Sequence, residues 1–378
     1  MVWMEKSVVE QRLEFVMMAC VEGANVSQLC ERFGISRKTG YKWLVRFDSQ
    51  APEESLGDAS RRPRASPRRS DAAVEAQVVQ LRREHPAWGG RKIAHLLELE
   101  QGLQVACSTV TSILHRHKLI DSRASEAATA WQRFEHVAPN HLWQMDFKGH
   151  FAMAKGRCHP LTVLDDHSRY NIVLQACSNE QGTTVQAALR DVFRRYGLPA
   201  RINTDNGQPW GDPRQYLTSL GAWLVRLGIR VSHSTPMHPQ TNGKDERFHR
   251  TLKAELLNGR TFADIPQCQR AFEQWRAVYN MRRPHEALQM QIPVQRYQPS
   301  NLVYPEVLPA IEYAPSDKVR RVSKAGRISI NGASVFISNA LHGMLVGLRQ
   351  SNQEADGLDV FFCHHRIKTL RLSELQKD

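Results

Sequence analysis

The stretch Trp143-Gln-Met-Asp-Phe147 carries one acidic residue, Asp146, within a largely apolar segment. An apolar strand seldom keeps an unpaired carboxylate, so Asp146 is a candidate for chemistry. Two further acidic residues downstream lie in motifs of their own, namely Asp205 and Glu246. Phosphoryl transfer on nucleic acid needs two divalent cations held about 4 Å apart by a few carboxylates. These three residues are the predicted catalytic and metal-binding set.

The sequence around the second and third acidic residues agrees with this role. Asp205 follows a predicted strand, and open α/β sheets bind ligands at the carboxyl ends of their strands. Asp-Asn-Gly is also typical of an ordinary turn, which is the alternative for Asp205. Glu246 lies in a predicted helix whose apolar stripe is Phe248, Leu252 and Leu256. Arg250 and Lys253 share the face of Glu246 and are predicted to contact DNA; a surface ladder of ion pairs is the alternative.

Residues 135–300 are predicted to form an α/β catalytic core, because strand-like and helix-like patterns alternate there. The predicted strands are 141–151, 160–165, 170–176 and 201–204, and the predicted helices are 184–196, 215–227 and 265–280. A second acidic cluster, Asp165-Asp166-His167-Ser168-Arg169, lies between two apolar runs. A hairpin turn is the favoured interpretation of this cluster, and a place near the site is the alternative.

Residues 1–50 are predicted to form a helix-turn-helix domain that binds DNA. Ser27 and Ser36 are predicted to cap its second and third helices, with a tight turn at Gly34. A three-helix packing module with a solvated basic face is the alternative. The side chains predicted to face outward toward phosphates and base edges are Arg37, Lys38, Thr39 and Lys42.

A basic linker and a second helix-turn-helix are predicted next. The linker covers 51–70, and its residues 59–70 include five Arg and two Pro. Proline and self-repulsion oppose packing there, so Arg61 and Arg62 are predicted to contact phosphates; a plain solvated linker is the alternative. Residues 71–122 repeat the helical pattern, with Ser108 as the predicted cap of the last helix.

The C-terminal residues 311–378 are predicted to form a small β-barrel. Apolar and polar residues alternate around Asn331-Gly332, which is a strong signal for a two-residue hairpin turn. Basic residues are frequent before this hairpin and are usable for phosphate contacts.

Composition favours a polyanionic partner. The 378 residues carry a net charge of +13, which favours nucleic acid before membrane, although a merely soluble basic protein is the alternative. No stretch reaches the length that a membrane-spanning helix needs. The seven cysteines are scattered without a Cys-x-x-Cys pair, so neither a disulfide framework nor a zinc site is expected. A cytoplasmic location is therefore predicted.

The combined motifs resemble a known family. Trp143-Gln-x-Asp146-Phe147, Thr204-Asp205-Asn206-Gly207 and His238-Pro-Gln-x-Asn-Gly-x-x-Glu246-Arg are similar to the retroviral-integrase-type core of bacterial insertion-sequence transposases. Tyr279-Asn-x-x-Arg283-Pro-His-x-Ala-Leu288 resembles the stretch that closes that core. The helix-turn-helix units match the family layout more loosely, and residues 301–378 match only in being a small β domain.

The resemblance implies an RNase H-like fold with an Asp-Asp-Glu site that holds two Mg²⁺ or Mn²⁺ ions. Asp146 would bridge both ions, and Asp205 and Glu246 would each hold one. A first cut at the end of the element would free a 3′ hydroxyl that attacks target DNA, with Lys253 near the cut. The expected partners are double-stranded element ends, target DNA and further copies of the chain, because two ends must be joined.

Two features depart from the retroviral pattern. Forty residues lie between Asp205 and Glu246, which is longer than is typical, and the extra length is assigned to the loop at 210–213. The zinc module that precedes retroviral integrase cores is missing, and helix-turn-helix units stand in its place. The resemblance therefore implies a bacterial element and a protein associated with the nucleoid. Two alternative functions stay open: a DNA-binding regulator without catalysis, and a structure-selective nuclease on the same fold.

Three histidines near the acidic residues are expected to be solvated rather than ligands or bases: His233, His238 and His249.

Overall fold

The computed structural model describes residues 6–59, 69–120, 135–212, 216–233 and 243–375. It divides into two compact units, Met1–Arg69 and Ser70–Asp378, which are described separately below. Among the described residues, no helix combines the length and the apolar character that crossing a membrane requires.

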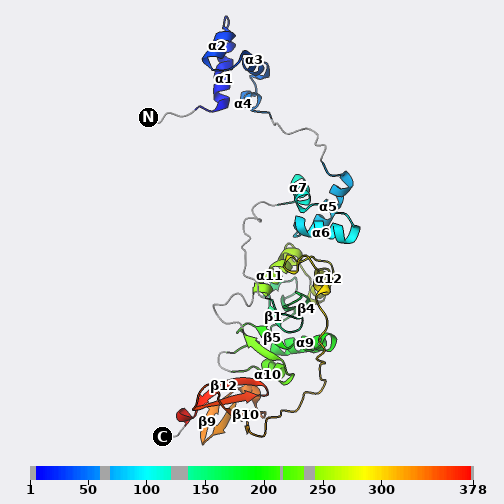
Figure 1. Ribbon diagram of the computed structural model, residues 1–378, viewed down its shortest axis with the longest axis vertical. Coiled ribbons are helices and arrows are strands. Elements are labelled where there is room, and N and C mark those ends of the chain that lie inside the picture. Colours follow the sequence, from blue (N-terminus) through cyan, green and yellow to red (C-terminus); the bar gives the residue numbers. More distant parts are fainter. Residues whose placement is uncertain (1–5, 60–68, 121–134, 213–215, 234–242, 376–378) are drawn as a thin grey trace. The chain divides into compact units, whose positions relative to one another are not determined.

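The first unit is a four-helix domain (Figure 1). Its helices are α1 (Val8–Ala19), α2 (Val26–Arg32), α3 (Arg37–Arg46) and α4 (Pro52–Leu56). Ser36 caps α3 as predicted, with its side chain accepting from the Thr39 amide. The prediction that Ser27 caps α2 is wrong. Asn25 is the N-cap, because α2 begins two residues earlier than predicted and the Asn25 side chain accepts from two amides of the first turn. The buried core residues are Phe15, Val16, Cys30, Trp43 and Leu56.

The second unit begins with another three-helix domain. Its helices are α5 (Ala72–Glu84), α6 (Gly90–Gln101) and α7 (Cys107–Arg116). The prediction that Ser108 caps the last helix is wrong, since Ala106 occupies the N-cap position of α7 and makes no side-chain cap. The helices enclose an apolar core that includes Trp88, Ile93, Leu97, Val110 and Ile113.

A mixed sheet follows. Its strands are β1 (Trp143–Phe147), β2 (Phe151–Ala152), β3 (Arg157–Asp165), β4 (Asn171–Cys177), β5 (Arg201–Thr204) and β6 (Arg230–His233). Strand β3 pairs antiparallel with β1, β2 and β4, while β1, β5 and β6 run parallel to one another. The predicted strand 141–151 is two strands, β1 and β2, separated by a turn that contains Gly149 at φ +81°.

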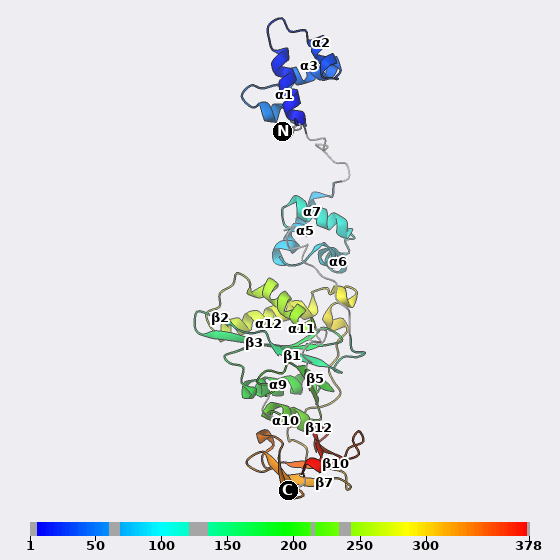
Figure 2. The same ribbon diagram turned by 90° about the vertical axis from the view of Figure 1, so that its left-hand side faces the viewer.

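Helices cover both faces of this sheet (Figure 2). One face packs against α9 (Gly182–Tyr196) and α10 (Ser219–Arg226), with Trp143 and Ile202 in the shared core. The other face packs against α11 (Gly243–Leu252), the π-helical segment η1 (Lys253–Leu257) and α12 (Ile265–Met281). The predicted apolar stripe of Phe248, Leu252 and Leu256 is buried there, as expected. Two short 3-10 segments follow, η2 (Glu286–Leu288) and η3 (Pro293–Gln295).

The C-terminal β region packs on α10, whose Ala222 and Val225 lie in its core. Its elements are β7 (Lys318–Arg321), β8 (Arg327–Ile330), β9 (Ala333–Phe336), η4 (Asn339–Leu341), β10 (Leu345–Gln350), β11 (Gly357–Phe362), β12 (His365–Arg371) and η5 (Leu372–Leu375). The Asn331-Gly332 hairpin is confirmed, with both residues at positive φ as its turn requires. The predicted barrel is not confirmed. Within the described residues the strands form an open sheet, β12-β11-β10-β7, and a separate hairpin of β8 and β9.

Candidate active site

The pairing of β1 with β5 brings Asp146 and Asp205 together. These strands are parallel neighbours, with Trp143 opposite Ile202 and Gln144 opposite Asn203. Each aspartate lies three positions beyond the first residue of that register, so the two lie opposite each other where β5 ends. Neighbouring strands are about 4.8 Å apart, which places two carboxyl groups side by side at the carboxyl end of the parallel strands.

The electrostatic setting of this pair favours a bound cation. Burial raises the pKa of Asp146 to about 7, and the charge of Asp205 and a smaller one from Glu180 act in the same direction. Near neutral pH, a cation that binds here competes with a proton. Asp205 is held by the Gly207 amide, which donates to its Oδ1 at 3.0 Å. A Cβ on Gly207 would lie 3.3 Å from Asp205 Oδ2, so glycine gives the turn room for this approach.

Helix α11 carries Glu246 and is tied to β1 through His249. The Thr162 hydroxyl donates to the Asp146 carbonyl oxygen at 3.0 Å, and His249 Nε2 lies 2.8 Å from the same hydroxyl oxygen. Because that hydroxyl has one proton, His249 donates from Nε2 and leaves Nδ1 unprotonated, 4.0 Å from Asp146 Oδ2. Burial lowers the pKa of His249 to about 4, so the ring is neutral. The expectation of a solvated His249 was wrong.

Glu246 lies in the first turn of α11, three positions before His249. Glu246 itself is exposed, and in the described part of the chain no three His, Cys, Asp or Glu side chains are grouped closely enough to hold a metal ion. The carboxyl oxygens of Asp146, Asp205 and Glu246 are nevertheless the donor type that Mg²⁺ and Mn²⁺ prefer. The neighbouring Asp245 is fully buried, and burial together with Asp146 raises its pKa well above the usual range.

Lysine side chains gather beside the carboxylates. Burial lowers the pKa of Lys148, two residues after Asp146, and the nearby charge of Lys253 lowers it further. The charge of Lys148 also contributes to the low pKa of His249. Lys253 and Arg250 are exposed. Lys148 was missed in the sequence because it lies just past the strand, with no motif of its own.

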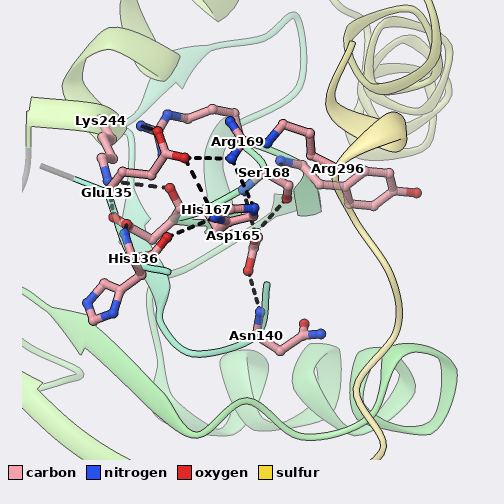
Figure 3. Close-up of polar contacts among 11 residues, drawn as sticks. Glu135, His136, Asn140, Asp165, His167, Ser168, Arg169, Lys244 and Arg296 are labelled. Atoms are coloured by element: carbon pink, nitrogen blue, oxygen red, sulfur yellow. Dashed lines mark hydrogen bonds and ion pairs between the residues drawn. The ribbon is translucent and has the colours of Figure 1, made fainter. Parts of the chain in front are cut away.

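The second acidic cluster is a buried turn (Figure 3). Asp165 accepts from the Ser168 amide and hydroxyl at 2.8 and 2.6 Å and from the Asn140 amide at 2.7 Å. The predicted turn is confirmed by the Arg169 amide, which donates to the Asp165 carbonyl oxygen at 3.0 Å. Both carboxylates are fully buried and have structural partners.

Asp166 also anchors the start of the helix that carries Glu246. Lys244 Nζ lies 2.5 Å from Asp166 Oδ1, which also accepts from Gln144 Nε2 at 2.7 Å. Burial lowers the pKa of Lys244 to about 8. Gln144 belongs to β1, so this cluster links the first turn of α11 to the strand of Asp146.

The predicted DNA-contacting residues of the N-terminal domain lie on α3. Arg37, Lys38 and Lys42 are exposed, whereas Thr39 is half-buried and its hydroxyl lies 2.9 Å from that of Ser36. Arg61 and Arg62 fall outside the described residues, as does His238. His233 is exposed at the edge of the site, with Nδ1 2.9 Å from the Asp205 carbonyl oxygen.

Family comparisons agree with this architecture. Models of the integrase core domain match residues 136–239 and 227–293, which contain all three predicted acidic residues. A model of the C-terminal domain of IS481 family transposases matches residues 317–378. Over these ranges the chain is similar to integrase cores and, over residues 317–378, to the C-terminal domain of IS481 family transposases. Helix-turn-helix and homeodomain-like models match residues 11–64 and 39–114 of the chain.

Individual relatives are insertion-element proteins. The chain is 25% identical over 278 residues to a 31.7 kDa uncharacterized protein of insertion element IS407 from Burkholderia multivorans, covering 72% of this chain and 91% of that protein. It is 27% identical over 219 residues to a 39.2 kDa uncharacterized protein of IS476 from Xanthomonas euvesicatoria, covering 57% of this chain and 62% of that protein.

Among solved structures, the HTLV-2 integrase catalytic core in complex with magnesium aligns at 19% identity with a TM-score of 0.34. The alignment covers 43% of this chain and 99% of that one. At this TM-score and identity, the alignment gives no information about the chemistry of this chain.

Proposed function

We propose that this protein is a transposase that binds the terminal sequences of its own insertion sequence, cleaves the DNA there and joins the freed ends to target DNA. The observation that supports the proposal is the parallel register of the inner strands β1 and β5, from which Asp146 and Asp205 are expected side by side at the carboxyl ends of these strands. An acidic pair at the end of parallel strands, in which the pKa of Asp146 is raised, is a candidate site for metal-dependent chemistry.

Asp146, Asp205 and Glu246 would hold the Mg²⁺ or Mn²⁺ ions. When bound, the ions would lower the pKa of the attacking water or 3′ hydroxyl and stabilise charge on the phosphate. His249, with Thr162, holds α11 against the strand of Asp146.

The remaining roles concern DNA. Lys148, Lys253 and Arg250 would contact the phosphate backbone beside the acidic residues. Exposed residues of α3 and the arginines of the linker would hold the element end. Joining two ends requires two sites, so we propose that the chain acts as a homo-oligomer on DNA.

End cleavage by purified protein tests this function. DNA carrying both flanking ends would be incubated with wild type or with Glu246→Gln, in Mg²⁺ or in EDTA. We expect Mg²⁺-dependent cleavage at the ends by wild type alone, with Glu246→Gln reduced at least about a thousandfold. Bound but uncut ends in both Mg²⁺ and Mn²⁺ would instead favour a DNA-binding regulator, and cutting without sequence preference would favour a nuclease.

A further inference from the structure

Glu255 is a buried carboxylate that accepts hydrogen bonds from three separate segments. Its Oε1 accepts from Arg283 Nε at 2.8 Å and from Trp88 Nε1 at 3.2 Å, and its Oε2 accepts from Trp275 Nε1 at 3.1 Å. The side chains of Glu255 and Arg283 are only 8% and 9% exposed. A buried carboxylate with three donors, one of them charged, is strongly fixed in position.

Glu255 lies in the same helical stretch as Glu246, whose helix α11 is called the catalytic helix below. Glu255 lies in η1, the π-helical segment that continues α11, nine residues after Glu246. Leu252 and Leu256, on either side of it in the chain, are buried in the core beneath the sheet. The position of Glu255 is therefore coupled to the position of Glu246 along one continuous helical stretch.

One of the three donors comes from the second helix-turn-helix domain. Trp88 is fully buried within that domain, just before α6, and its ring stacks on His85 with centroids 3.8 Å apart. Its indole N–H points out of the helix-turn-helix domain and donates to Glu255, which belongs to the integrase-like core.

Other contacts join the same two parts. Arg282, at the end of α12, donates to both carboxylate oxygens of Glu100 on α6 at 2.6 and 2.8 Å. The half-buried side chain of Val278 on α12 packs against the apolar core that contains Trp88. The exposed pair of Arg91 and Glu286, 3.3 Å apart, adds little because solvent screens it.

We propose that Glu255 is a positioning residue that fixes the second helix-turn-helix domain against the catalytic helix through Trp88. The effect of this contact on cleavage rests on the proposed function. DNA bound by the second helix-turn-helix domain would then reach Asp146, Asp205 and Glu246 at one fixed position along its length. Trp275 and Arg283 bond to the same carboxylate from within the core, so they hold Glu255 in place without linking the two domains.

This difference supplies a matched pair of variants. Trp88→Phe and Trp275→Phe each remove one indole donor to Glu255 and keep an aromatic ring, so both are expected to fold. Hydrogen exchange of the full-length chain, followed by mass spectrometry, would compare residues 86–98 and 278–290. We expect exchange in both segments to rise at least about threefold in Trp88→Phe, whereas Trp275→Phe changes only the core segment.

Cleavage of element ends is the second readout, measured per bound end so that affinity is separated from rate. We expect Trp88→Phe to bind ends as wild type does, to cut them about tenfold more slowly and to spread the cut over neighbouring positions, with Trp275→Phe keeping the cut position. Equal exchange and equal cutting in the two variants would overturn the proposal. Wild-type protein that binds but never cuts would refute the proposed function, and the exchange comparison would still decide whether Glu255 fixes the domain.

Discussion

At the scale of single residues, the site contains a carboxylate, Asp146, whose ionised form is destabilised by burial. Its neighbours include a neutral histidine and a lysine. Asp146 has a pKa near 7 because of burial and Asp205, while His249 stays neutral and Lys148 lies close by. Charge that is unfavourable in the absence of a ligand is typical of sites built for a cation or for a transition state.

Asp146→Asn is therefore predicted to stabilise the protein in metal-free buffer. The folded pKa of Asp146 is raised to about 7, above its unfolded value. The wild type thus loses stability as pH rises from about 4 to about 7, and the variant does not. Three pKa units correspond to about 4 kcal/mol, but partial exposure of the side chain reduces the expected gain at pH 8 to about 1–3 kcal/mol.

Urea unfolding in EDTA at pH 4.5 and pH 8 would measure this difference. The gain should be small at the lower pH and large at the higher one. An equal effect at both pH values, or destabilisation at pH 8, would show that Asp146 is an ordinary paired carboxylate.

The three acidic residues were proposed from the sequence because each lies in a motif, but their surroundings could not be predicted from it. His249 is buried because α11 packs across Thr162, which lies 87 positions earlier in the chain. Glu255 similarly gains donors from Trp88 and Trp275, which are 167 and 20 positions away. No local pattern reports such contacts, since they depend on how helices dock onto the sheet.

At the scale of elements, periodicity predicted most of the core, and capping was less certain. Strand β5 was predicted with its observed bounds, and α9 and α12 within two residues at either end. Strand β6 was missed, because its four residues, Arg230–His233, include only one apolar side chain. Asn25 and Ser27 are both good capping residues, so the sequence alone did not select between them.

The observed cap of α2 gives a direct comparison. Asn25→Ala is predicted to lower the free energy of unfolding of the N-terminal domain by about 1 kcal/mol, because its side chain accepts from the Ser27 and Gln28 amides. Ser27→Ala is the matched control and should change stability by less than about 0.5 kcal/mol. Thermal unfolding monitored by circular dichroism would show the reverse order if Ser27 were the cap.

At the scale of the whole molecule, the chain joins two helix-turn-helix domains, an integrase core and a C-terminal β region. The domain order could be predicted from the sequence, because each part has its own periodicity. The open form of the C-terminal sheet could not be predicted. Hairpin motifs indicate which strands pair as neighbours, but they do not indicate whether the sheet closes into a barrel.

The charge of the molecule predicts salt-sensitive binding. With a net charge of +13, we expect the chain to neutralise several phosphates at each element end. The logarithm of the binding constant should then fall with the logarithm of salt concentration with a slope steeper than about −4. Fluorescence anisotropy with a labelled end between 50 and 300 mM salt would measure the slope. A flat response would contradict phosphate contact by the basic residues.

The most direct test of the central claim is strand joining with precut ends. Duplexes with a free 3′ hydroxyl at the element end would be mixed with supercoiled plasmid and Mg²⁺. The proteins compared would be wild type, Asp146→Asn and Asp191→Asn, the last changing an exposed acid on α9. We predict joined products from wild type and Asp191→Asn, and none from Asp146→Asn although it still binds the ends. Joining by Asp146→Asn at the wild-type rate would contradict the assignment of the active site.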